Sequence, residues 1–227
     1  MSTLTEIKYE TPQFPRQLRL DITTQCNAHC LSCHRFLTKR HGEMPTELIT
    51  QILHDVAKWS VPLTEIVPVN YGELFLRKDW LWILEMIARY LPETQIVIPT
   101  NGSLMSSENV KKLCSIPNIH IINFSINALF DITYVQFMSL PIQTLRTIVK
   151  AMELIKVLRA DITLWASMVF DPQYCSDLER DAFITYWKQY AFPQIIPAAS
   201  AGRGTKILIP RTKPCRSLFS DIVIGYD

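Results

Sequence analysis

The order of strand and helix patterns is the feature that most constrains how this chain folds. Short runs rich in β-branched residues alternate with longer stretches whose apolar residues recur at helical spacing. Strands are expected at 18–23, 65–70, 95–99, 119–125, 162–169 and 194–198, and helices at 47–59, 80–90, 107–113, 145–158 and 178–190. Such alternation builds βαβ units around a parallel sheet. Six units predict an α/β fold with an open or partial barrel, because a closed barrel of this kind has eight.

Length and composition favour one main domain without a nucleic-acid or membrane partner. A chain of 227 residues with 48% hydrophobic content can bury one sizeable core. Its 23 basic and 21 acidic residues give a formal net charge of only +2, whereas nucleic-acid binding usually shows as a basic patch. No apolar run approaches the ~18 residues of a membrane span, and the N-terminus lacks the pattern of a secretory signal. A cytoplasmic protein is expected.

A change of composition near residue 200 predicts the domain organisation. No linker divides the chain before that point, whereas Gly202, Gly204, Pro210 and Pro214 follow it within a few residues. Glycine and proline at this density interrupt regular elements. We therefore expect a core domain over 1–200 and a different substructure over 201–227.

Three of the six cysteines fall within eight residues, directly after the first expected strand. Cys26, Cys30 and Cys33 form a C-x3-C-x2-C pattern, which in this setting indicates metal or redox chemistry instead of disulfides. Thiolates are the usual ligands of iron–sulfur clusters, and three of them leave one iron of four open to a small molecule. The alternative is a structural zinc site with His29 or His34 as the fourth ligand. His34 adjoins Cys33, which is poor spacing for a tetrahedral site.

This cysteine pattern resembles the cluster motif of the radical S-adenosylmethionine (SAM) superfamily. The resemblance implies a partial (βα)6 TIM-like barrel and a [4Fe-4S] cluster on the three cysteines, with SAM chelating the open iron. Ser32 stands where the superfamily often has an aromatic residue, and its carbonyl is expected to reach the adenine. The longer string from Thr24 to Met44 resembles the SPASM/twitch branch, which carries a C-terminal auxiliary-cluster region.

The segment after the second expected strand, Tyr71-Gly72-Glu73-Leu74, resembles the superfamily's Gly-Gly-Glu-Pro motif. The resemblance implies that the Glu73 carboxylate binds the positively charged amino group of SAM, a charge-assisted contact. Gly72 permits close approach of the backbone. The alternative is a surface glutamate at a turn.

Two further segments follow expected strands, where the loops of a parallel barrel carry the active site. The segment 100–102 resembles the family's Thr-Asn-Gly, which places Asn101 at the cofactor pocket, with a plain turn as the alternative. The segment 125–127 resembles its Ser-Ile-Asp, with asparagine at the acidic position. Because alternate residues of a strand share a face, Ser125 and Asn127 are both expected to bind the ribose hydroxyls. Weaker candidates for SAM are Ser167 and Arg203.

The remaining cysteines divide into two kinds. Cys215, followed by the apolar run 222–224, resembles the entry to a SPASM region and predicts the start of an auxiliary hairpin. No further cysteine follows, so the region is incomplete in this sequence, and an unpaired thiol is the alternative. Cys114 and Cys175 are expected to be small buried or half-buried residues and not ligands.

The resemblance implies an enzyme that cleaves SAM reductively to a 5′-deoxyadenosyl radical, which abstracts hydrogen from a substrate. Its partners would be SAM, a flavodoxin- or ferredoxin-like electron donor, and a peptide or small-molecule substrate. The alternative function is a non-catalytic metal-binding protein, either a degenerate radical SAM relative or a zinc module.

Overall fold

A parallel seven-stranded sheet forms the centre of the molecule. The computed structural model describes residues 14–37, 41–198 and 220–226. The strands are β1 (Gln17–Leu20), β2 (Glu65–Val67), β3 (Gln95–Thr100), β4 (Ile119–Ser125), β5 (Thr163–Phe170), β6 (Phe192–Pro197) and β7 (Asp221–Ile224). Every neighbouring pair is parallel, in the order β6-β5-β4-β3-β2-β1-β7. The expected α/β fold with a partial barrel is therefore confirmed.

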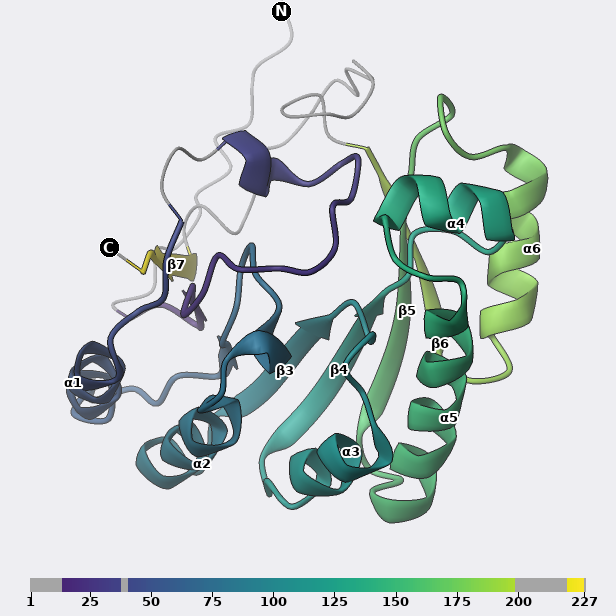
Figure 1. Ribbon diagram of the computed structural model, residues 1–227. Helices are drawn as coiled ribbons and strands as arrows, with labels where there is room; N and C mark the ends of the chain where they lie inside the picture. Colours follow the sequence, from purple (N-terminus) through teal and green to yellow (C-terminus); the bar gives the residue numbers. More distant parts are fainter. Residues whose placement is uncertain (1–13, 38–40, 199–219, 227) are drawn as a thin grey trace, which may run out of the picture.

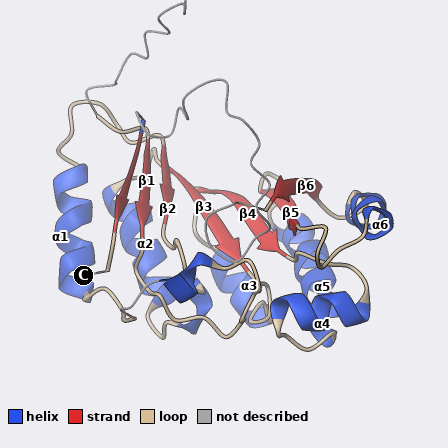
Figure 2. Cartoon of the chain, turned by 90° about the horizontal axis from the view of Figure 1, so that it is seen from above, coloured by secondary structure: helices blue, strands red, loops and turns tan. Residues whose placement is uncertain are grey.

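Helices cover the convex face of this curved sheet (Figures 1 and 2). They are α1 (Thr46–Val56), α2 (Trp80–Tyr90), α3 (Ser107–Cys114), α4 (Asp131–Met138), α5 (Gln143–Leu158) and α6 (Asp177–Trp187), with short 3-10 turns η1 (His34–Leu37) and η2 (Leu74–Leu76). The main core includes fully buried strand residues such as Leu18, Ile98 and Phe124, and helix residues such as Ile83 and Ile148. The carboxyl ends of all strands meet at one edge, where a shared site is expected.

β1 and β2 each end three residues earlier than the sequence predicts, and local hydrogen bonds explain both. β1 stops at Leu20, because the Ile22 amide turns back to the Leu20 carbonyl at 2.9 Å. β2 stops at Val67 because the chain then bends around the Asp21 carboxylate. This carboxylate accepts hydrogen bonds from the amides of Asn70 (3.1 Å) and Tyr71 (3.2 Å). The polar loops after β1 and β2 are thus joined directly.

Helix α4 is an element that the sequence does not predict. It is short, and its apolar residues point in all directions: Phe137 and Met138 are buried, whereas Ile132 and Val135 are exposed. Without an apolar stripe on one side there is no helical period to detect. Figure 1 shows α4 above the carboxyl ends of the strands, beside the cysteine loop.

The C-terminal strand corrects one expectation. Residues after Cys215 were expected to begin an auxiliary hairpin, but β7 pairs in parallel with β1, from Asp221 opposite Gln17 to Ile224 opposite Leu20. It therefore extends the main sheet and gives the edge of β1 a hydrogen-bonded neighbour. The boundary near residue 200 and Cys215 itself lie outside the described residues, so the division into 1–200 and 201–227 stays a prediction. Within the described segments, no helix is both long and apolar enough to cross a membrane.

Candidate active site

The three motif cysteines lie on the loop that follows β1. This loop crosses the carboxyl ends of the strands and reaches α4, where the His29 amide donates to the Met138 carbonyl at 3.1 Å (Figure 1). The sulfur of Cys26 accepts from the Ala28 amide at 3.4 Å. The Cys33 amide donates to the Cys30 carbonyl at 3.1 Å. All three thiols are free and half-buried.

The donor set fits an iron–sulfur cluster. Burial raises the pKa of Cys26, and burial together with the charges of Cys26 and Cys33 raises that of Cys30 to about 12. A bound cation is therefore needed to favour the thiolates. Three thiolate ligands match the donor set of such a cluster, in which each would bind a separate iron.

Glu73 joins three loops of this edge. Its side chain is only 1% exposed, so the alternative of a surface glutamate is wrong. One carboxylate oxygen accepts from the Asn101 amide at 2.7 Å and the other from the Thr100 hydroxyl at 2.9 Å. The Glu73 amide donates to the Gln25 carbonyl at 2.7 Å. The carboxylate therefore faces the loop after β3, and its contact with SAM stays a prediction.

Gly72 allows the loop after β2 to touch the cysteine loop. A Cβ added there would lie 2.2 Å from the carbonyl oxygen of Thr23 and 2.9 Å from that of Gln25. Real Cβ atoms essentially never come so near to another heavy atom. The predicted close approach thus occurs between two segments of the protein backbone.

Asn101 does more than form a turn, because its side chain reaches the cysteine loop. Its side-chain nitrogen, Nδ2, donates to the Asn27 side-chain oxygen at 2.9 Å and lies 3.8 Å from the sulfur of Cys26. Its side-chain oxygen accepts from the Ser103 amide at 2.9 Å. Asn101 is 5% exposed. The sequence predicts Asn101 at the cofactor pocket, and the structure brings its side chain beside the motif cysteine Cys26.

The expected pairing of Ser125 and Asn127 on one face does not hold. β4 ends at Ser125, and Asn127 has a left-handed backbone (φ 64°), so strand alternation no longer applies. The Asn127 side chain accepts from the Val169 amide at 2.8 Å and donates to the sulfur of Met138 at 3.0 Å. Asn127 therefore anchors α4 to β5. Half-buried Ser125 stays the candidate for the ribose.

The other predicted cofactor residues have different surroundings. Ser32 lies half-buried in the turn between Cys30 and Cys33. The Ser167 hydroxyl lies 2.5 Å from the Asn123 side-chain oxygen and 3.3 Å from that of Gln194, in a polar row across β4, β5 and β6. Arg203 lies outside the described residues. Cys175 is buried and Cys114 half-buried, as expected.

Comparison with known families decides the assignment. The family model of the radical SAM superfamily matches residues 20–173, which run from the last residue of β1 through β5 and include Cys26, Cys30, Cys33 and the loops that carry Glu73 and Asn101. The chain belongs to the radical SAM superfamily. Its members use a [4Fe-4S] cluster and SAM.

The curated relatives that this radical SAM chain resembles are named GTP 3',8-cyclase. It is 27% identical over 179 residues to a probable GTP 3',8-cyclase of Methanosarcina acetivorans, covering 76% of this chain and 51% of that protein. It is 34% identical over 99 residues to a GTP 3',8-cyclase of Haemophilus influenzae, covering 42% of this chain and 29% of that protein. The chain thus spans about half or less of the length of these curated relatives.

Solved structures share the fold. An anSMEcpe structure with bound AdoMet aligns with a TM-score of 0.63 at 17% identity, over 81% of this chain and 51% of that one. Streptococcus suis SuiB bound to the precursor peptide SuiA aligns with a TM-score of 0.66 at 16% identity, over 82% of this chain and 40% of that one.

Sequence reasoning missed Met138, which contacts one of the three motif cysteines. Its sulfur lies 3.5 Å from that of Cys30 and accepts from Asn127. Its contact with Cys30 spans 108 residues, and it belongs to the unpredicted helix α4. A lone methionine in an apolar stretch carries no signal that distinguishes it from an ordinary core residue.

The buried carboxyl of Glu73 predicts a pH-dependent stability. Burial raises its pKa from 4.5 to about 7, so the folded chain holds this proton more tightly than the unfolded chain. The free energy of unfolding therefore falls as pH rises from about 4.5 to about 7, by up to about 3 kcal/mol. Glu73→Gln removes the charge and keeps an oxygen for the Asn101 amide, and its amino group can donate to the Thr100 hydroxyl at the loss of the weak hydrogen bond from the Phe75 amide. We expect the variant to gain stability over the wild type at pH 8 but not at pH 4.5.

Urea unfolding of the metal-free chain at both pH values measures this difference. Parallel pH profiles for the wild type and Glu73→Gln would show that Glu73 does not titrate in this range.

Proposed function

We propose that this chain is the catalytic core of an enzyme that cleaves SAM reductively and uses the resulting 5′-deoxyadenosyl radical to abstract hydrogen from a substrate C–H bond. The observation that carries the proposal is the convergence of three motif loops on Cys26. Asn101 reaches its sulfur, Glu73 holds the Asn101 amide, and Glu73 and Gly72 fix the backbone leading to Cys26.

Each residue of the site has a defined task in this proposal. Cys26, Cys30 and Cys33 would hold the [4Fe-4S] cluster, which when bound supplies the electron and an open iron for SAM. The side-chain amide of Asn101 points a donor at the Cys26 sulfur, and hydrogen bonds to its sulfur ligands tune the redox properties of a cluster. The carbonyl of Ser32 and the hydroxyl of Ser125 are the proposed adenine and ribose contacts. The packed helix α4 shields Cys30 from water on one side.

The proposal extends to the class of substrate, the electron donor and the branch of the superfamily. The substrate is a peptide or a small molecule, since the solved relatives include peptide-bound SuiB, and BtrN in complex with AdoMet and 2-DOIA. The electron comes from a flavodoxin- or ferredoxin-like donor in the cytoplasm. The curated relatives are named GTP 3',8-cyclase, whereas the SPASM/twitch assignment rests on the motif string from Thr24 to Met44 and on Cys215.

Anaerobic reconstitution tests the proposal. We expect the purified chain, treated with iron and sulfide, to turn brown and bind about four iron atoms. After reduction with dithionite it should convert SAM to methionine and 5′-deoxyadenosine, measured by chromatography. Colourless protein that retains zinc would support the zinc module, and a loaded cluster without 5′-deoxyadenosine would support the degenerate relative.

A further inference from the structure

The two ends of the cysteine loop run side by side at its base. The Met44 amide donates to the Ile22 carbonyl at 2.8 Å, and the Thr24 amide donates to the Gly42 carbonyl at 3.0 Å. The three cysteines lie between these ends, so they are carried on a loop that is closed at its base.

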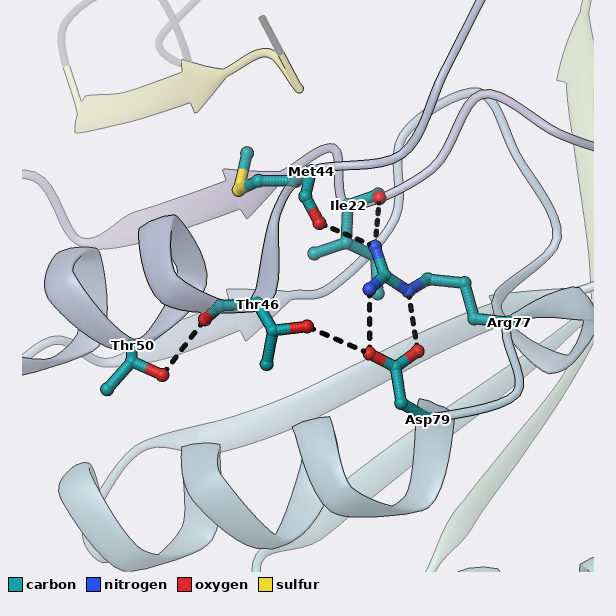
Figure 3. Close-up of polar contacts among 6 residues, drawn as sticks. All are labelled: Ile22, Met44, Thr46, Thr50, Arg77 and Asp79. Carbon is teal, nitrogen blue, oxygen red and sulfur yellow. Dashed lines mark hydrogen bonds and ion pairs between the residues drawn. The ribbon is translucent and has the colours of Figure 1, made fainter.

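One buried side chain holds both ends of this loop. The guanidinium of Arg77 donates from a single nitrogen to the carbonyls of Ile22 and Met44, each at 2.8 Å (Figure 3). Arg77 is only 4% exposed. A buried cation is costly unless its hydrogen-bonding groups have partners, and here two backbone carbonyls and a carboxylate supply them.

Asp79 fixes the orientation of that guanidinium. Its two carboxylate oxygens accept from Nε of Arg77 at 2.8 Å and from Nη2 at 2.7 Å, a bidentate pair. The hydroxyl of Thr46, the first residue of α1, lies 3.3 Å from the same carboxylate (Figure 3). The hydrogen bond from Arg77 lowers the pKa of Asp79. The guanidinium is thus aimed at the loop base by a group that stays ionised.

The same segment of chain touches the loop at a second point. Glu73, four residues before Arg77, donates its amide to the Gln25 carbonyl. The short turn η2 (Leu74–Leu76) connects these two anchors. One rigid segment after β2 therefore holds the loop both at its base and next to Cys26.

We propose that Arg77 is a positioning residue that keeps the cysteine loop closed, so that Cys26, Cys30 and Cys33 are already gathered when the cluster assembles. The inference rests on the proposed cluster function for its purpose. The quantity that it predicts is the rate at which the loop opens, and this rate can be measured in the metal-free chain. Lysine cannot replace arginine here, because an ammonium lacks the planar fork that serves the carboxylate and both carbonyls together.

Thiol alkylation of the metal-free chain measures loop opening directly. We expect Arg77→Lys to raise the alkylation rate of Cys30 by iodoacetamide at least about tenfold, mapped by mass spectrometry. The Met44 amide should lose protection from hydrogen exchange. After reconstitution, the electron paramagnetic resonance spectrum of the reduced cluster should shift, and iron content should fall to below about half of the wild-type value.

Arg159 provides a matched control. It makes the same bidentate pair, with Asp161 at 2.8 and 2.7 Å, and also donates to the Ile116 carbonyl at 3.0 Å, but it follows α5 at the opposite end of the sheet. Arg159→Lys should leave the alkylation of Cys30 and the cluster spectrum unchanged.

The outcomes separate this inference from the proposed function. Wild-type alkylation and exchange in Arg77→Lys would overturn it, as would an equal increase in Arg159→Lys, which would indicate general destabilisation. If Arg77→Lys does not fold, Asp79→Asn tests the same clamp, with faster alkylation expected and an unchanged rate counting against it. A wild-type chain that binds no iron would refute the proposed function, while the alkylation rates of the metal-free variants would still decide the role of Arg77.

Discussion

Replacing Cys30 with alanine is expected to abolish iron retention and to lower 5′-deoxyadenosine formation by at least about 100-fold. Loss of a group that only supports a metal ligand typically costs 10–100-fold, and here a ligand itself is removed. Cys30 also packs against Met138, and its pKa is raised to about 12 by burial and by the charges of Cys26 and Cys33.

Cys114→Ala is the matched control for this experiment. Cys114 is a free, half-buried thiol at the end of α3, a helix that packs against α5. Its removal should leave iron content and SAM cleavage at wild-type levels. Full activity in Cys30→Ala, or loss of iron in both variants, would contradict the assignment of the cluster to the three motif cysteines.

Much of the fold could be predicted from the sequence because the apolar pattern records which side of each element is buried. Helix α2, for example, has the bounds that its apolar spacing predicts, Trp80–Tyr90, with Ile83, Leu84 and Ile87 buried. Element ends were less predictable where a side chain captured the backbone, as Asp21 does after β2. α4 was missed because it is apolar on all sides.

In the candidate site, too, some features could be predicted from the sequence and others could not. The cysteines, Glu73 and Asn101 carry motifs, so their presence at one edge followed from strand order. Their contacts did not follow, because each depends on how loops distant in sequence meet. Arg77 lies 55 residues from Ile22, and nothing in a Leu-Arg-Lys-Asp string indicates that this arginine is buried and its lysine neighbour is not.

The second large effect is expected at Gly72, where alanine should destabilise the chain by about 3 kcal/mol and prevent stable cluster binding. Overpacking typically costs 1–3 kcal/mol, and the upper end applies when the obstacle is backbone that cannot rotate away. The added Cβ would meet the carbonyl oxygen of Thr23 at 2.2 Å and that of Gln25 at 2.9 Å. To relieve this clash, the backbone segment that leads to Cys26 must move away from Gly72, and with it the Gln25 carbonyl must move away from the Glu73 amide. Urea unfolding and iron content of the reconstituted variant measure the two consequences.

Gly42→Ala distinguishes this mechanism from a general intolerance of side chains near the loop. Its Cβ would meet the ring of Tyr226 at 2.6 Å, but the obstacle is the far end of a side chain, which can turn aside. The same substitution near the other end of the same loop should therefore cost less than about 1 kcal/mol and leave iron binding intact. Equal losses in both variants would show that the loop rejects any added volume, whereas a tolerated Gly72→Ala would mean that the contact between Gly72 and Thr23 does not fix the position of Cys26.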